Sequence, residues 1–134
     1  MKVCEVMVSN PACCRPDTDL AAVTALLWDH NCRAIPVINE ENRPVGMITD
    51  RDISIALGTR NRRAAEIPVA QVITGKVFAC EEDAEIHEAL ACMNQNHVRR
   101  LIIIEEGRVS GILSIDDIVL NIQWSENKRV ELSS

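Results

Sequence analysis

The chain has 134 residues, of which 47% are hydrophobic and 25% are charged. This composition supports one packed domain, or two small units that share a core, and argues against disorder. The net charge of −6, with only one Phe and two Trp, argues against a general nucleic-acid binder and against a base-stacking platform. Because no apolar run of about eighteen residues and no apolar leader is present, we expect a cytoplasmic protein without a membrane span.

The first half predicts a β-α-β-β-α unit. Its helix carries Leu20, Val23 and Leu27 on one face, and Asp17 or Thr18 supplies its start signal. Pro36 cannot donate to a β-ladder, so its strand is expected at an edge or a strand start. The other expected elements are a lead-in turn at 4–8, an extended piece at 12–14, strands at 34–38 and 44–48, a turn at 39–42 and a closing helix at about 50–57.

The second half predicts the same order of elements. Its first helix carries Ile86, Ala89, Leu90 and Met93 on one face, with Glu82 or Asp83 as the start signal. The other expected elements are a turn at 69–73, an extended piece at 77–80, strands at 101–104 and 108–113, a turn at 105–107 and a helix at about 116–122. We therefore expect repeats at 3–58 and 68–123, a linker at 59–67 and a polar tail at 124–134.

One motif appears in both halves. Residues 46–53 return as residues 111–118, and each copy reads glycine, two apolar residues, a hydroxyl residue and an aspartate three places later. Upstream, Cys14 matches Cys80 in steady register, with a single residue deleted in the turn before Gly111. A repeat of this kind indicates two equivalent packed units and two equivalent sites.

The cysteines and the linker allow two interpretations each. None of the six cysteines forms a C-x-x-C pair, and Cys32 and Cys92 match aliphatic positions in the other copy, which favours inert thiols over redox or metal sites. The linker arginines, Arg60, Arg62 and Arg63, favour a solvated segment. A contact with a phosphate or a partner is the alternative.

The repeated motif could bind a ligand or only cap a helix. Thr49-x-x-Asp52 and Ser114-x-x-Asp117 have the spacing of a capping box. The same helix start offers N–H groups to a phosphate and a carboxylate to ribose hydroxyls. Arginines before the apolar strands favour phosphate recognition over simple surface exposure. Two acids in each motif are too few oxygen donors to predict a metal.

These features resemble tandem CBS domains, the Bateman module, over roughly residues 3–122. The resemblance rests on Arg-x-h-Pro-h-h at 33–38 and on the duplicated G-h-h-[ST]-x-x-D motif. It implies an α/β (α+β) fold in which two repeats pack sheet to sheet with pseudo-two-fold symmetry and leave two clefts. It also implies an adenosine ligand: AMP, ADP, ATP, NAD or S-adenosylmethionine.

The resemblance also implies ligand-binding residues. For the ribose they are Asp52 with Thr49 and Asp117 with Ser114. For the phosphate they are Arg33, Arg51, Arg99 and Arg100, and for the base they are Cys14, Val77, Phe78 and Cys80. The copies differ, because Ile102 replaces Pro36, Arg100 replaces Ala34 and Asp116 replaces Arg51. We therefore expect unequal clefts.

Three functions remain to be compared. The first is an adenine-nucleotide sensor that passes ligand occupancy to a regulated protein or to its own dimer interface. The second is a ligand-independent interaction module in which the two motifs only cap helices. The third, an enzyme, is disfavoured because no nucleophile–base pair, metal cage or phosphate loop is visible. The apolar closing helices at 53–57 and 118–122, together with the resemblance, predict a homodimer.

Overall fold

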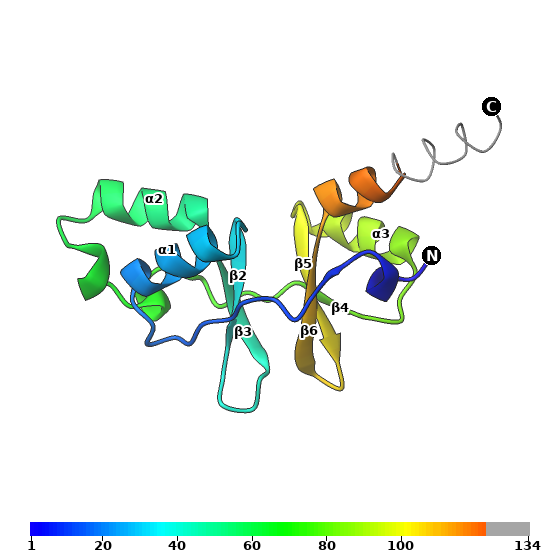
Figure 1. Ribbon diagram of the computed structural model, residues 1–134, viewed down its shortest axis with the longest axis horizontal. Helices are drawn as coiled ribbons and strands as arrows, with labels where there is room; N and C mark the ends of the chain where they lie inside the picture. Colours follow the sequence, from blue (N-terminus) through cyan, green and yellow to red (C-terminus); the bar gives the residue numbers. More distant parts are fainter. Residues whose placement is uncertain (123–134) are drawn as a thin grey trace. The chain divides into compact units, whose positions relative to one another are not determined.

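The computed structural model describes residues 1–122, in which the chain forms two compact units (Figure 1). The first-repeat unit comprises residues 10–77 with 106–109. The second-repeat unit comprises residues 1–9, 78–105 and, among the described residues, 110–122. The predicted tail at 124–134 lies outside the described residues.

The first-repeat unit is a two-stranded antiparallel sheet with helices on one face (Figure 1). The hairpin pairs Ala34 with Thr49 and Ile35 with Ile48, so strand β3 ends where α2 begins. The elements are α1 (Leu20–Asp29), β2 (Ala34–Ile38), β3 (Pro44–Thr49), α2 (Asp50–Thr59) and the short 3-10 helices η2 (Ala64–Glu66) and η3 (Val69–Gln71).

The second-repeat unit is a four-stranded sheet in the order β1-β6-β5-β4, with β4 and β5 parallel. Its elements are η1 (Val3–Glu5), β1 (Val8–Ser9), β4 (Ala79–Glu81), α3 (Ile86–Asn96), β5 (Arg100–Glu105) and β6 (Arg108–Ser114). Residues 115–122 are helical. The predicted mixed α/β class is confirmed, and so are the paired strands and closing helix of each repeat.

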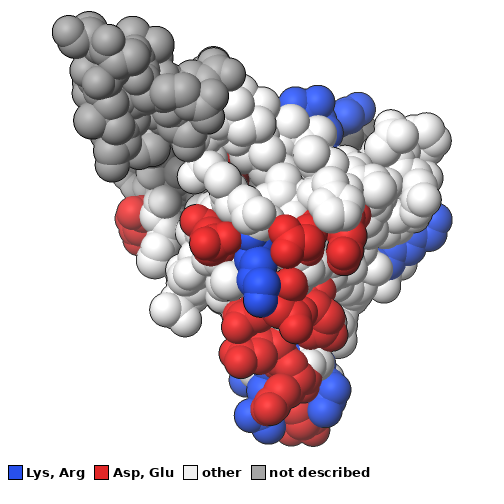
Figure 2. Space-filling model, turned by 90° about the vertical axis from the view of Figure 1, so that its right-hand side faces the viewer, with Lys and Arg blue, Asp and Glu red and all other residues white. Residues whose placement is uncertain are grey.

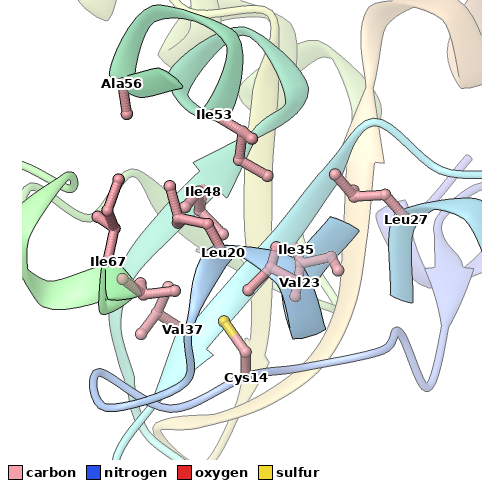
Figure 3. Packing of buried hydrophobic residues seen from close by; sticks show 11 residues of the cluster. Cys14, Leu20, Val23, Leu27, Ile35, Val37, Ile48, Ile53, Ala56 and Ile67 are labelled. Atoms are coloured by element: carbon pink, nitrogen blue, oxygen red, sulfur yellow. The ribbon is translucent and has the colours of Figure 1, made fainter. Parts of the chain in front are cut away.

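Each unit has its own apolar core. In the first-repeat unit Leu20, Val23 and Leu27 of α1 pack with Ile35 and Ile48 of the hairpin (Figure 3). The predicted face of α1 is therefore confirmed. In α3, Ala89 and Met93 are buried as predicted, but Leu90 is 38% exposed, so its assignment to the buried face was wrong.

Two prolines explain why the extended pieces of the two repeats differ. In the second copy, Ile102 N–H donates to Phe78 O and Glu82 N–H donates to Ile104 O, which flank the β4–β5 pairing. The matching residues of the first copy are Pro36 and Pro16, which have no N–H. Only the isolated bridge between Cys14 and Val37 remains, so residues 12–14 form no strand.

The helix starts also differ from the prediction. The N-cap of α1 is Asp19, whose side chain accepts a hydrogen bond from Ala22 N–H, rather than Asp17 or Thr18. The N-cap of α3 is Glu85 instead of Glu82 or Asp83. Glu85 makes no side-chain cap but forms an ion pair with the Met1 amino group at 3.2 Å. Both helices thus begin at an acidic residue further along the chain.

The lead-in segments pack in the unit of the other repeat. Val3 belongs to the core of the second-repeat unit, and β1 pairs with β6 through Val8 and Ile112. Val69 belongs to the core of the first-repeat unit. The two compact units therefore exchange the segments that open the sequence repeats. The linear boundaries 3–58 and 68–123 stay a prediction about the sequence repeat.

Candidate ligand-binding site

The start of α2 is closed by a reciprocal cap. Asp52 N–H donates to Thr49 Oγ1 at 3.1 Å, and Thr49 N–H donates to Asp52 Oδ2 at 2.9 Å. The β-region backbone of Thr49 ends strand β3 and turns its side chain back on the first helical turn. The capping box predicted from the sequence is therefore confirmed, and it satisfies two backbone donors at this helix start.

The second repeat has the same geometry. Asp117 N–H donates to Ser114 Oγ at 3.1 Å, and Ser114 N–H donates to Asp117 Oδ2 at 3.0 Å. Both aspartates and both hydroxyl residues are half-buried. The helix at 115–122 thus begins as α2 does, and the repeated sequence motif forms the same two hydrogen bonds in both copies.

Each carboxylate has one oxygen left over. The caps use Oδ2 of Asp52 and Oδ2 of Asp117. Within residues 1–122, Oδ1 of neither aspartate accepts a hydrogen bond or forms an ion pair. The cap therefore orients the carboxylate without using all its acceptor capacity, and an external hydroxyl donor can be accepted there.

The backbones of two predicted phosphate-binding arginines lie next to these helix starts. Asp50 N–H donates to Arg33 O at 3.0 Å, and in the second repeat Ile115 N–H donates to Arg99 O at the same distance. The side chains of both arginines are exposed. Arg99 and Asp116 approach to 3.8 Å with about 70% of each side chain exposed (69% and 76%), so this ion pair contributes little. Arg33 and Arg99 are therefore held near the motif and keep accessible guanidinium groups.

The remaining predicted phosphate residues are placed differently. Arg51 is exposed in the first turn of α2, and Arg100 is half-buried in β5. Each repeat thus contributes two of the predicted phosphate residues, Arg33 and Arg51 in the first and Arg99 and Arg100 in the second, and only Arg100 is half-buried. Figure 2 shows that Asp and Glu outnumber Lys and Arg on the face it draws, in keeping with the net charge of −6.

Sequence reasoning missed a small cavity beside Asp52. Its volume is about 130 Å³, and it is lined by Asp52, Ile55, Ala56, Thr59, Arg60 and Val72. Four of the lining residues, Asp52, Ile55, Ala56 and Thr59, lie on one face of α2 at i, i+3, i+4 and i+7. This spacing is the sequence pattern from which they could have been predicted. A concavity in the second-repeat unit, of about 320 Å³, lies beside Arg99 and is lined also by Leu90, Met93, Asn94, His97, Val98 and Ile115.

The predicted base-contacting residues lie in two settings. Cys14 is 5% exposed and points into the core of the first-repeat unit (Figure 3). Phe78 and Cys80 are half-buried against the core of the second-repeat unit, whereas Val77 is 36% exposed and belongs to the first-repeat unit. Their contact with a base stays a prediction. The Cys14 thiol is buried, and its backbone is hydrogen-bonded to β2, where Cys14 N–H donates to Pro36 O and Cys14 O accepts from Ile38 N–H.

Burial favours the protonated form of the Cys14 and Cys80 thiols. Burial raises the pKa of Cys14 to about 11, with a further contribution from Cys13. Burial likewise raises the pKa of Cys80 to about 11, followed by the effects of Cys92, Glu81 and Glu88. All six cysteines are free. A raised pKa lowers the thiolate fraction at neutral pH, which fits the predicted inert role.

The comparison with family models decides the assignment. The model of the CBS domain matches residues 3–59 and 69–123. The chain belongs to the CBS domain family. The predicted tandem CBS module is therefore confirmed. Among the residues that the structure describes, no helix is long and apolar enough to cross a membrane, and no group of three or more His, Cys, Asp or Glu could hold a metal ion.

Relatives of this CBS pair differ in length. An uncharacterized 17.7 kDa protein of Acidianus ambivalens is 34% identical over 87% of this chain and 70% of its own length. Uncharacterized protein MK0525 of Methanopyrus kandleri is 30% identical over 78% of this chain, which spans 54% of that protein. An inosine-5'-monophosphate dehydrogenase of Mycobacterium tuberculosis is 30% identical over 84% of this chain, which spans only 21% of the enzyme.

A solved structure has the same fold. The CBS domain pair of protein MJ0100, in complex with 5′-methylthioadenosine and S-adenosyl-L-methionine, has a TM-score of 0.82. It is 21% identical and covers 93% of this chain and 98% of the other. At that identity the likeness shows the fold of a CBS pair.

Proposed function

We propose that this CBS pair binds an adenosine-containing ligand through Asp52 and Asp117 and passes its occupancy to another protein or to its own dimer interface. The ligand is AMP, ADP, ATP, NAD or S-adenosylmethionine. The observation that carries the proposal is the carboxylate oxygen that each capping box leaves without a partner in the described chain. A ribose presents two adjacent hydroxyl donors, and a fixed carboxylate is a strong acceptor for them.

The surrounding chemistry supports a ligand with a phosphate or another charged group. The Thr49 and Ser114 hydroxyl oxygens accept one backbone N–H each, so each hydroxyl still has its own proton to donate. Arg33, Arg51, Arg99 and Arg100 supply guanidinium groups for the anion, and Cys14, Val77, Phe78 and Cys80 are assigned to the base. The complex of MJ0100 with two adenosine compounds, in a protein of the same fold, favours this ligand class.

Signalling requires a ligand that binds one state better than another, because equal affinity for both shifts no equilibrium. Each closing helix carries exposed apolar residues, and we expect these residues to supply the interface of a homodimer. Ile55 and Leu57 of α2 are 51% and 42% exposed. Val119, Leu120 and Ile122 of the closing helix are 45%, 63% and 51% exposed. We expect a cytoplasmic, regulatory protein that neither catalyses a reaction nor binds nucleic acid or membrane.

A second function is favoured by one observation. Both capping boxes are complete with protein atoms alone, so the two motifs have a structural role in any case. A ligand-independent interaction module would use the same fold and need no nucleotide. Titration calorimetry with AMP, ADP, ATP, NAD and S-adenosylmethionine separates the two: saturable binding supports the sensor, and no heat with any of the five supports the interaction module.

A further inference from the structure

The segment that follows α2 concentrates positive charge in an acidic protein. Arg60, Arg62 and Arg63 fall within four residues, while the whole chain carries a net charge of −6. Within residues 1–122 none of the three lies within 4.0 Å of a carboxylate, since the ion pairs found there involve Met1 with Glu85 and Arg99 with Asp116. A solvated linker needs no such clustering of unneutralised guanidinium groups.

Two of these guanidinium groups are held in place by one residue. Arg60 Nη2 donates to Gln71 O at 2.7 Å, and Arg62 Nη1 donates to Gln71 Oε1 at 3.0 Å. Arg62 Nη2 also donates to Glu66 O. Both cations are therefore brought together against their mutual repulsion, with neutral acceptors only. An anion between them would relieve that repulsion.

The same residues line a concavity of about 440 Å³. Its walls are Leu57, Arg60, Asn61, Arg62, Arg63 and Glu66. This volume falls in the range of small-ligand sites, which is roughly 300–1,000 Å³. A guanidinium has five N–H donors, so Arg60 and Arg62 keep donors beyond the bonds described above. The Arg63 side chain makes no hydrogen bond within residues 1–122, and only its backbone carbonyl is used, by Glu66 N–H.

We propose that Arg60, Arg62 and Arg63 form a polyanion site for a compound with two or more linked phosphate groups. Three guanidinium forks match the several oxygens of such a group better than they match a single carboxylate. The site is separate from the capping boxes, although Arg60 also lines the small cavity beside Asp52. The phosphates would come either from an inorganic compound or from the tail of a nucleoside di- or triphosphate held by Asp52.

Calorimetry with inorganic pyrophosphate tests the proposal on the full chain. At 50 mM salt we expect one pyrophosphate per chain, with an affinity that falls as salt is raised to 200 mM. Arg62→Gln with Arg63→Gln should weaken binding at least tenfold. Arg63→Gln alone should weaken it several-fold and removes no side-chain hydrogen bond or ion pair of the described chain. Exposed Arg108, outside the concavity, provides the matched control Arg108→Gln, for which we expect less than a twofold change.

Several results would overturn the proposal. These are no pyrophosphate binding at 50 mM salt, unchanged binding by folded Arg63→Gln, an equal loss in Arg108→Gln, or equally tight binding of a glutamate-rich peptide. Asp52→Asn should leave pyrophosphate binding within twofold, and abolished binding would contradict a separate site.

If the phosphates come from a nucleotide, the arginine variants should weaken the binding of ADP but not of adenosine. An inorganic source predicts that they weaken pyrophosphate only. A failure of adenosine binding would affect only the proposed function.

Discussion

Replacing Asp52 by asparagine separates the capping role of this residue from its proposed ligand role. In Asp52→Asn the amide oxygen can still accept Thr49 N–H, so the cap made by Asp52 Oδ2 is retained. The second carboxylate oxygen becomes an NH2 group, which donates and cannot accept a ribose hydroxyl. We therefore expect a protein of near-normal stability with weakened ligand binding.

The magnitude follows from the hydrogen bonds lost. A bond to a charged acceptor contributes roughly 1.5–3 kcal/mol, so losing one weakens binding about 10- to 150-fold. Asp52→Ala should show the same loss of affinity and also lose about 1 kcal/mol of stability with the cap. Thr49→Ala removes the hydroxyl that accepts Asp52 N–H, and should cost stability more than affinity. Asp117→Asn and Ser114→Ala provide the matched pair in the second repeat.

The assay combines calorimetry with the five adenosine ligands and thermal melts without ligand. A loss of about 1 kcal/mol should lower the melting temperature by a few degrees in a chain of this size. If folded Asp52→Asn and Asp117→Asn proteins both bind as tightly as the unchanged protein, the carboxylates only cap their helices. That result would refute the ligand role of these two residues.

Four further predictions concern the fold and the assembly. Gly111→Ala should cost about 1–3 kcal/mol by chemical denaturation, because its Cβ would overlap Met7 Sδ and lie 3.0 Å from the backbone atom Val8 O. Gly46→Ala meets only the flexible end of Ile73 at 2.7 Å and should cost less, and equal losses would contradict this. Pro36→Ile should give residue 36 an amide that is protected from hydrogen exchange by Ala12 O, as Ile102 is by Phe78 O, and rapid exchange would count against the proline explanation. Folding raises the pKa of Cys14 and of Cys80 from 9.0 to about 11, so the stability that their protonated thiols contribute is complete below pH 9 and should decline from pH 9 to 11. The free energy of unfolding should decline less over this range in Cys14→Val, and an identical pH profile would contradict this cause. Leu120→Asp should shift the mass measured by light scattering from dimer toward monomer, and an unchanged dimer would exclude this face from the interface.

The sequence was sufficient wherever the relevant information is local or repeated. The Thr49 and Ser114 caps follow from a hydroxyl and an acid three residues apart, and both appear in the structure. The mixed α/β class follows from short apolar strands and helical spacing in two copies. The ligand assigned to the motifs stays a prediction, because the geometry of a cap is the same with or without a ligand.

What the sequence did not reveal depends on distant contacts. The pairing of Val8 with Ile112 joins segments about a hundred residues apart, so the exchange of lead-in segments leaves no local signal. Helix α1 begins after Asp19, not after Asp17 or Thr18, and its first residue Leu20 donates its N–H to Ile67 O, a tertiary contact that the local sequence does not indicate. The cavity beside Asp52 includes Val72, which only the folded chain brings to α2.

A crystal structure of the protein purified with a ligand carried over from cells tests the central claim most directly. The account predicts an adenosine compound whose ribose hydroxyls lie within hydrogen-bond distance of Asp52 Oδ1 or Asp117 Oδ1, with both capping boxes intact. An adenosine compound bound elsewhere, while both of these oxygens contact only solvent, would contradict it.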